Sequence, residues 1–253
     1  GFFCMSGHSK WHTIKHKKGA ADARRGKLFT RIIKELTVAA RTGGGDPDAN
    51  PRLRTIIAEA KSVNMPADNI KRAILRGTGE LPGASYEEMT YEGYGPGGAA
   101  LIIETLTDNK NRTVGEMRHL LSKYGGNLAA ENSVAWMFDK KGYIVVHKSK
   151  IDEDTLMSAA LEAGAEDLRD DEDSWEVISA PEAYQKVLEA VKGLGIEPDA
   201  AEIAFLPQSY VKLEGKTAQQ MVKLMEAIEE HDDTKKVWSN ADIEEKEIEA
   251  SLA

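Results

Sequence analysis

Residues 99–124 read AALIIETLTDNKNRTVGEMRHLLSKY, and this stretch contains a strand, a loop and a helix in succession. The apolar run that opens it predicts a buried strand over residues 99–106. Asp108 and Asn109 are residue types that cap helices, and they precede a segment that predicts a helix over about residues 113–124. A strand followed at once by a helix indicates a fold that mixes both kinds of element.

The chain that follows repeats this pattern. It predicts a β-α-β-β-α-β order, with strands at 143–147, 166–170, 174–179 and 201–206 and helices at 152–163 and 182–191. This order is the split unit of a ferredoxin-like sandwich. The strands predicted at 99–106, 134–138, 210–213 and 235–239, with helices at 113–124 and 218–231, give the same order again. We therefore expect a domain of residues 81–140 and 207–253 into which a second domain, residues 141–206, is inserted.

The chain that precedes residue 81 predicts a small helical domain. Phe29, Ile32, Ile33, Leu36 and Ala40 recur at helical spacing. Asn50 and Pro51 are suited to the cap and the first turn of a second helix, and a third is expected from about Pro66 to Gly77. The fold class is thus α+β: a three-helix head over residues 1–80, then two ferredoxin-like β-α-β-β-α-β domains, one inserted in the other.

Composition excludes several classes of protein. The 253 residues include one cysteine, Cys4, so disulfides and cysteine-based sites inside the folded body are not expected. No apolar run approaches the roughly 20 residues that span a bilayer. We expect a cytoplasmic protein without a secretory signal, whose natural start is Met5, and we expect a monomer.

The charge is distributed unevenly along the chain. Residues 1–80 carry 16 Lys and Arg against 7 Asp and Glu (+9), whereas residues 81–253 carry 17 against 35 (−18). This asymmetry favours a head that binds a polyanion, with a solvated helix face as the alternative. The side of the first helix that carries Lys27, Arg31 and Lys34 is expected to stay available to phosphates. The candidate nucleic-acid contacts are Lys10, Trp11, Lys15, His16, Lys17, Lys18, Arg24, Arg25, Lys27 and Arg31.

Other motifs predict no metal and no cofactor. His8, His12 and His16 have helical spacing, but the lysines among them would repel a cation and no carboxylate lies between them. Gly93, Gly95 and Gly98 precede a strand rather than a helix, which indicates a hairpin instead of a dinucleotide fingerprint. Lys110 and Arg112 lie beside a predicted helix N-terminus and are possible anion contacts, although capping explains that cluster equally well. No catalytic set is evident, and we expect no enzyme.

Several segments closely resemble the YebC family. They are MSGHSKW (5–11), IKHKK (14–18), RGKLFT (25–30), GGGDP (43–47), YEGYGPGG (91–98), TDNKNRT (107–113) and GGNL (125–128). They run in order from Met5 almost to the C-terminus, apart from four extra leading residues.

The resemblance implies a cytoplasmic bacterial protein with a basic helical head and two α+β domains, and it implies no enzyme activity. It also implies two partners. The family name, probable transcriptional regulatory protein, implies DNA; kinship with the mitochondrial translational activator of cytochrome oxidase implies ribosomal or messenger RNA and a role in easing stalled translation at the ribosome. Attraction to phosphates does not separate the two. A surface Trp11 would stack on an unpaired base and so favour RNA, although a Trp near a helix start is as often an anchor in the core.

Overall fold

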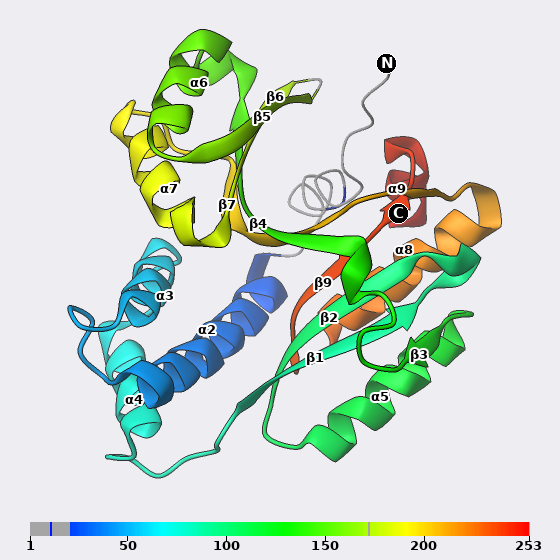
Figure 1. Cartoon of the computed structure of the whole chain (residues 1–253). Helices are drawn as coiled ribbons and strands as arrows, with labels where there is room; N and C mark the ends of the chain where they lie inside the picture. Colours follow the sequence, from blue (N-terminus) through cyan, green and yellow to red (C-terminus); the bar gives the residue numbers. More distant parts are fainter. Residues whose placement is uncertain (1–10, 12–20, 172, 253) are drawn as a thin grey trace.

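From residue 21 onward, the head consists of three packed helices. The structure, a computed structural model, describes residue 11, residues 21–171 and residues 173–252. Its first helices are α2 (Ala21–Gly43), α3 (Pro51–Ser62) and α4 (Ala67–Thr78) (Figure 1). Asn50 caps α3 by accepting a hydrogen bond from the Leu53 amide at 3.1 Å, as predicted. Ile32 and Leu36 of α2 pack with Leu53 of α3 in the core of the head.

A first four-stranded antiparallel sheet follows the head. It contains β1 (Glu87–Tyr94), β2 (Ala100–Thr107), β3 (Asn127–Ala129) and β9 (Thr234–Ser239) in the order β3-β1-β2-β9. Helices α5 (Lys110–Lys123) and α8 (Gly215–Glu230) cover one face, where Leu101 and Ile103 pack with Met117 and Met221. The β1–β2 hairpin predicted from the glycines is confirmed, with Tyr94 opposite Ala100. Gly97 in its turn has φ +73°, and a Cβ there would lie 2.4 Å from Leu213.

A second antiparallel sheet is built from contiguous chain. It contains β4 (Phe138–His147), β5 (Ala165–Asp171), β6 (Ser174–Ser179) and β7 (Ala200–Pro207) in the order β5-β6-β4-β7. Helices α6 (Glu153–Glu162) and α7 (Tyr184–Gly193) cover its outer face, where Ile144 and Val146 pack with Leu156 and Val187. This is the strand order of a ferredoxin-like sandwich.

The two sheets share a core. Alternate residues of β2, Ala100 and Ile102, point away from α5 and α8 and pack with Trp238 of β9 and with Tyr143 and Val145 of β4. The sheets thus meet through their inner faces, with α6 and α7 on one outer side and α5 and α8 on the other (Figure 1).

Two predicted strands of the first sheet are wrong. Residues 135–137 form a 3-10 helix, because the buried Glu92 carboxylate accepts hydrogen bonds from the Asn132, Val134 and Ala135 amides and holds the segment out of the sheet. The strand expected at 210–213 is the two-residue β8 (Val211–Lys212), which pairs with β10 (Ala241–Asp242) instead. The corresponding place in the first sheet is taken by β1, which precedes β2 in the chain.

The remaining elements are short: β8 (Val211–Lys212), β10 (Ala241–Asp242), α9 (Glu245–Ser251) and the 3-10 helices Pro96–Gly98, Ala135–Met137, Lys148–Lys150 and Pro181–Ala183. Among the helices described, none combines the length and the apolar character needed to cross a bilayer.

Candidate nucleic-acid interface

One cation on the basic side of α2, Lys34, is covered by the body, residues 81–253. Lys34 is buried, and its Nζ lies 3.1 Å from Oδ1 of Asp233 and donates to the Asp232 carbonyl at 2.9 Å. The expectation that this residue stays available to phosphates is therefore wrong. The partner that covers Lys34 lies in the connection between α8 and β9, 199 residues away in the chain.

Asp233 joins the head to helix α5 of the body. Besides Lys34, its carboxylate accepts hydrogen bonds from Arg112 Nη2 at 2.8 Å and from Thr113 Oγ1 at 2.9 Å. Burial acts to raise the pKa of Asp233, but the hydrogen bonds from Arg112, Lys34 and Thr113 outweigh it and hold the pKa at about 2. The carboxylate is thus ionised at neutral pH.

The two candidate anion contacts at α5 already have carboxylate partners. Arg112 binds Asp108 at 2.9 Å as well as Asp233, and Lys110 pairs with Glu87. Asn109 caps the helix by accepting from the Arg112 amide at 3.1 Å. Of the two roles that the sequence left open for this cluster, the structure shows helix capping. An external anion would have to compete with the chain's own carboxylates for Lys110 and Arg112.

Trp11 is a core residue and not a surface platform. Its side chain is only 3% exposed, packs with Met221, Val222 and Ile248, and donates from Nε1 to Glu229 Oε1 at 2.6 Å. Of the two roles expected for Trp11, base stacking is therefore wrong and the core anchor is confirmed, because the body covers the ring. The residue instead anchors the start of the head to α8.

The other predicted head contacts fall into two groups. Lys27 is exposed and donates to the Glu230 carbonyl at 2.8 Å, whereas Arg31 is partly buried and binds Glu59 at 2.5 Å and Glu35 at 3.3 Å. The rest lie outside the described residues: Lys10, Lys15, His16, Lys17, Lys18 and the side chains of Arg24 and Arg25. Their contacts with nucleic acid stay a prediction.

A further set of exposed cations was not singled out from the sequence. Lys61 lies in the last turn of α3. The solvent side of α4, opposite the buried Ile70 and Ala73, carries Lys71, Arg72 and Arg76. Within the described part of the chain none of these four cations forms an ion pair. The amphipathic pattern of residues 67–78 could have indicated these cations, because its polar side is basic while its apolar side packs in the core.

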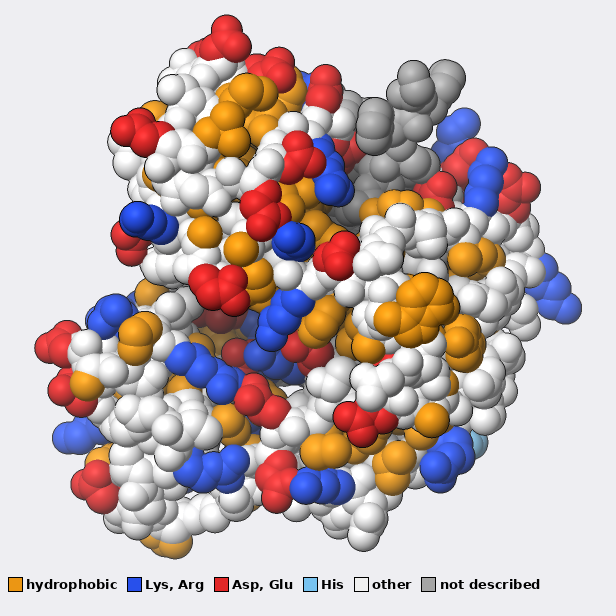
Figure 2. Space-filling model, in the orientation of Figure 1, with side chains coloured by type: hydrophobic (Ala, Val, Ile, Leu, Met, Phe, Trp, Pro, Cys, Tyr) orange, Lys and Arg blue, Asp and Glu red, His pale blue; other side chains and the backbone are white. Residues whose placement is uncertain are grey.

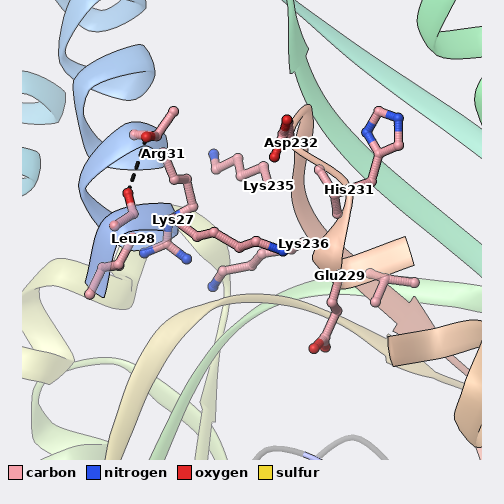
Figure 3. A pocket seen from close by; sticks show the side chains of 12 residues that line it. Lys27, Leu28, Arg31, Glu229, His231, Asp232, Lys235 and Lys236 are labelled. Carbon is pink, nitrogen blue, oxygen red and sulfur yellow. Dashed lines mark hydrogen bonds between the residues drawn. The ribbon is translucent and has the colours of Figure 1, made fainter. Parts of the chain in front are cut away.

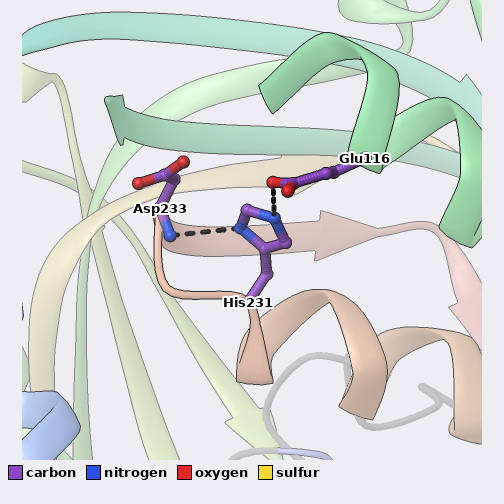
Figure 4. A group of neighbouring side chains, drawn as sticks. All are labelled: Glu116, His231 and Asp233. Carbon is purple, nitrogen blue, oxygen red and sulfur yellow. Dashed lines mark hydrogen bonds and ion pairs between the residues drawn. The ribbon is translucent and has the colours of Figure 1, made fainter. Parts of the chain in front are cut away.

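Glu116, His231 and Asp233 form a cluster whose ligand-type atoms lie within 4.8 Å of one another (Figure 4). The imidazole is already used on both sides: Nδ1 accepts from the Asp233 amide at 3.1 Å and Nε2 lies 2.7 Å from Glu116. Since Lys34 and Arg112 also occupy the Asp233 carboxylate, this arrangement is that of a hydrogen-bond network that fixes the α8–β9 connection.

Comparison with known proteins agrees with this architecture. Residues 9–80 match the model of the TACO1/YebC protein N-terminal domain, and residues 86–241 match that of the TACO1/YebC second and third domain. A protein of Acidobacterium capsulatum named "Probable transcriptional regulatory protein" is 61% identical over 96% of this chain and 98% of its own length. One of the same name from Desulfosudis oleivorans is 60% identical over 94% of this chain and 97% of its own length.

A solved structure is also similar. The crystal structure of the conserved hypothetical protein Aq1575 from Aquifex aeolicus matches with a TM-score of 0.81 and 46% identity, over 91% of this chain and 96% of that one. Its fold and the two family models, which together cover most of the chain, lead to one conclusion. The chain belongs to the TACO1/YebC family.

Proposed function

We propose that the chain is a non-enzymatic regulator of gene expression that binds nucleic acid through its head. The observation that carries the proposal is the charge distribution: residues 1–25 hold six Lys and Arg against one Asp, in a chain whose net charge is −9. Such a basic segment, on a protein that is otherwise acidic, is attracted to the phosphates of nucleic acid. The names of the relatives, which describe regulators of transcription, support DNA as the partner.

The contacts we propose are phosphate contacts. In the described head, Lys71, Arg72 and Arg76 are exposed on α4, while Lys34 is committed to Asp233. The proposed interface therefore combines the basic N-terminal segment (Lys10, Lys15, Lys17, Lys18, Arg24 and Arg25) with the outer side of α4. If about six to eight of these cations neutralise duplex phosphates, log affinity falls against log salt with a slope of roughly −5 to −7.

A charge-reversal pair tests the proposal. Lys71→Glu with Arg72→Glu should weaken binding to every nucleic acid alike, because the change acts on phosphates and not on base readout. Lys186→Glu with Lys223→Glu, two exposed lysines of the body, makes the same change of charge as a control. Fluorescence anisotropy over a series of salt concentrations gives the slope of log affinity against log salt for the parent and for each variant. If both pairs bind as the parent does, and so does Lys17→Glu with Arg25→Glu, the head is only a solvated surface.

The family description, which joins YebC with TACO1, supports a second candidate. In this alternative the partner is the ribosome or messenger RNA, and the protein eases stalled translation. Binding to promoter DNA, random DNA and purified ribosomes at one salt concentration separates the two. A transcription regulator prefers its promoter to random duplex, whereas a translation factor prefers ribosomes and ignores the DNA sequence.

A further inference from the structure

A pocket of about 480 Å³ lies where the head meets the body. Its walls come from the start of α2 and from the α8–β9 segment, and four cations line it: Lys27 and Arg31 from α2, and Lys235 and Lys236 from β9. Figure 3 shows these four side chains reaching from the two elements toward the space between them. Two positively charged groups from the head thus face two from the body.

Most of the carboxylates that pair with these cations do not line the pocket. Lys236 pairs with Glu202 of β7, Arg31 binds Glu59 of α3 at 2.5 Å, and Lys235 lies 3.8 Å from Glu35, and none of these three carboxylates lines the pocket. Around the hollow between the head and the sheets, Figure 2 shows Lys and Arg side chains beside Asp and Glu side chains. The ion pairs hold the cations in place, and the cations themselves line the pocket.

The two carboxylates that do line the pocket do not neutralise it. Glu229 accepts the indole hydrogen bond of Trp11 at 2.6 Å, and in Figure 3 its carboxylate points away from the lysines. Asp232 is exposed, so that water weakens the field of its charge in the pocket. Among the described residues, the lining therefore carries four positive charges against two negative ones, and one of the two is turned aside.

The charges of the residues that line the pocket indicate that a bound anion would stabilise their arrangement. Burial and the neighbouring Arg31 lower the pKa of Lys236 to about 8, against the opposing effect of Glu104, Glu35 and Glu59. Two cations are thus held close together in a partly desolvated place, where their mutual repulsion is strong. An anion between them would relieve that repulsion.

We propose that this pocket binds the phosphate group of a nucleotide, clamped between Lys27 and Arg31 of the head and Lys235 and Lys236 of the body. The volume lies in the range of small-molecule sites and exceeds what a phosphate alone would fill, so it has room for the attached sugar and base. The phosphate belongs either to a free nucleotide or to a nucleic-acid strand. The second source rests on the proposed function, whereas the first does not.

The test uses the full chain and a mononucleotide, AMP, as the probe in calorimetry, with inorganic phosphate as a smaller competitor. Lys27→Gln with Lys235→Gln removes one charge from each wall, while Lys186→Gln with Lys223→Gln makes the same change of charge away from the pocket. We expect one saturable site whose affinity falls by about tenfold or more in the pocket variant, because each lost group donates a charged hydrogen bond, and stays unchanged in the control.

Displacement distinguishes the two sources of phosphate. A short single-stranded oligonucleotide that displaces AMP from the parent protein identifies a strand as the source, and failure to displace it identifies a free nucleotide. If AMP does not bind to one site, or if the pocket and control variants lose affinity equally, the pocket proposal is overturned. Nucleic-acid binding that persists in that case leaves the proposed function intact, so the two can fail separately.

Discussion

Asp233 links the head to the body, and replacing it with asparagine tests that role directly. The substitution keeps the shape of the side chain and removes its charge, which leaves Lys34 buried without an anionic partner; the Lys34 side chain is only 9% exposed. Removing one member of a buried ion pair costs about 3–5 kcal/mol of folding free energy. Arg112 is 42% exposed and keeps Asp108 as a partner, so we expect the lower end, about 3 kcal/mol, for Asp233→Asn.

The same carboxylate makes a second, pH-dependent prediction. Its pKa is about 2 in the folded protein against an ordinary value of 3.8, so the folded state favours the ionised form. The stability that this provides is fully present above about pH 4 and is lost as pH falls toward about 2, an amount of about 2 kcal/mol. The difference in unfolding free energy between parent and Asp233→Asn should therefore shrink by about 2 kcal/mol between pH 5 and pH 2.

Urea unfolding followed by circular dichroism at several pH values measures both quantities. Asp232→Asn is the matched control, because that neighbouring side chain is exposed and only its backbone carbonyl receives the Lys34 hydrogen bond. We expect it to change stability by less than about 0.5 kcal/mol. A loss below about 1 kcal/mol for Asp233→Asn at neutral pH, or a difference that does not change on acidification, would refute the reasoning.

Three further predictions concern the Trp11 anchor, the loop of residues 132–135 and the second sheet. Trp11→Ala should cost about 3–5 kcal/mol in urea unfolding, whereas Trp11→Phe, which loses the Glu229 hydrogen bond and keeps most of the packing, should cost about 1–2 kcal/mol; equal costs would contradict the anchor. Glu92→Gln should destabilise by about 1–3 kcal/mol and speed amide exchange in residues 132–135, which would not change if the carboxylate were a bystander. A fragment of residues 138–207 should unfold cooperatively on its own, because the core between its sheet and its helices contains only its own residues; a fragment without a cooperative transition would argue against an inserted domain.

Local signals in the sequence predicted the local structure well. The Asn50 cap and the Pro51 start of α3, the β1–β2 hairpin and the strand at 174–179 all depend on neighbours within a few residues, and all three are confirmed. The α+β class and the strand order of the second sheet follow for the same reason, because the whole sandwich is contiguous in the chain.

The failures share a physical cause, which is contact over long sequence distance. Lys34 looked like an exposed cation because its partner, Asp233, lies 199 residues away. The sequence left the role of Trp11 open because α8 is remote from it in the chain, and the loop at 132–135 depends on Glu92 some 40 residues earlier. For the candidate interface, the sequence thus located the basic head but not the side of the head that the body covers.

The position of β9 near the end of the chain also has a consequence for folding during synthesis on the ribosome. β9 completes the first sheet by pairing with β2, with Ile102 opposite Trp238. During translation, the edge of β2 must therefore wait, unpaired, until nearly all of the 253 residues have been made, because β9 begins only at Thr234. An apolar strand edge of this kind is prone to pair with other chains. The second sheet can form in the meantime, since all of its strands emerge earlier. We expect the nascent chain to pass through a stage in which the later sheet is complete and the earlier one is open, and truncation before residue 234 should yield an aggregating product.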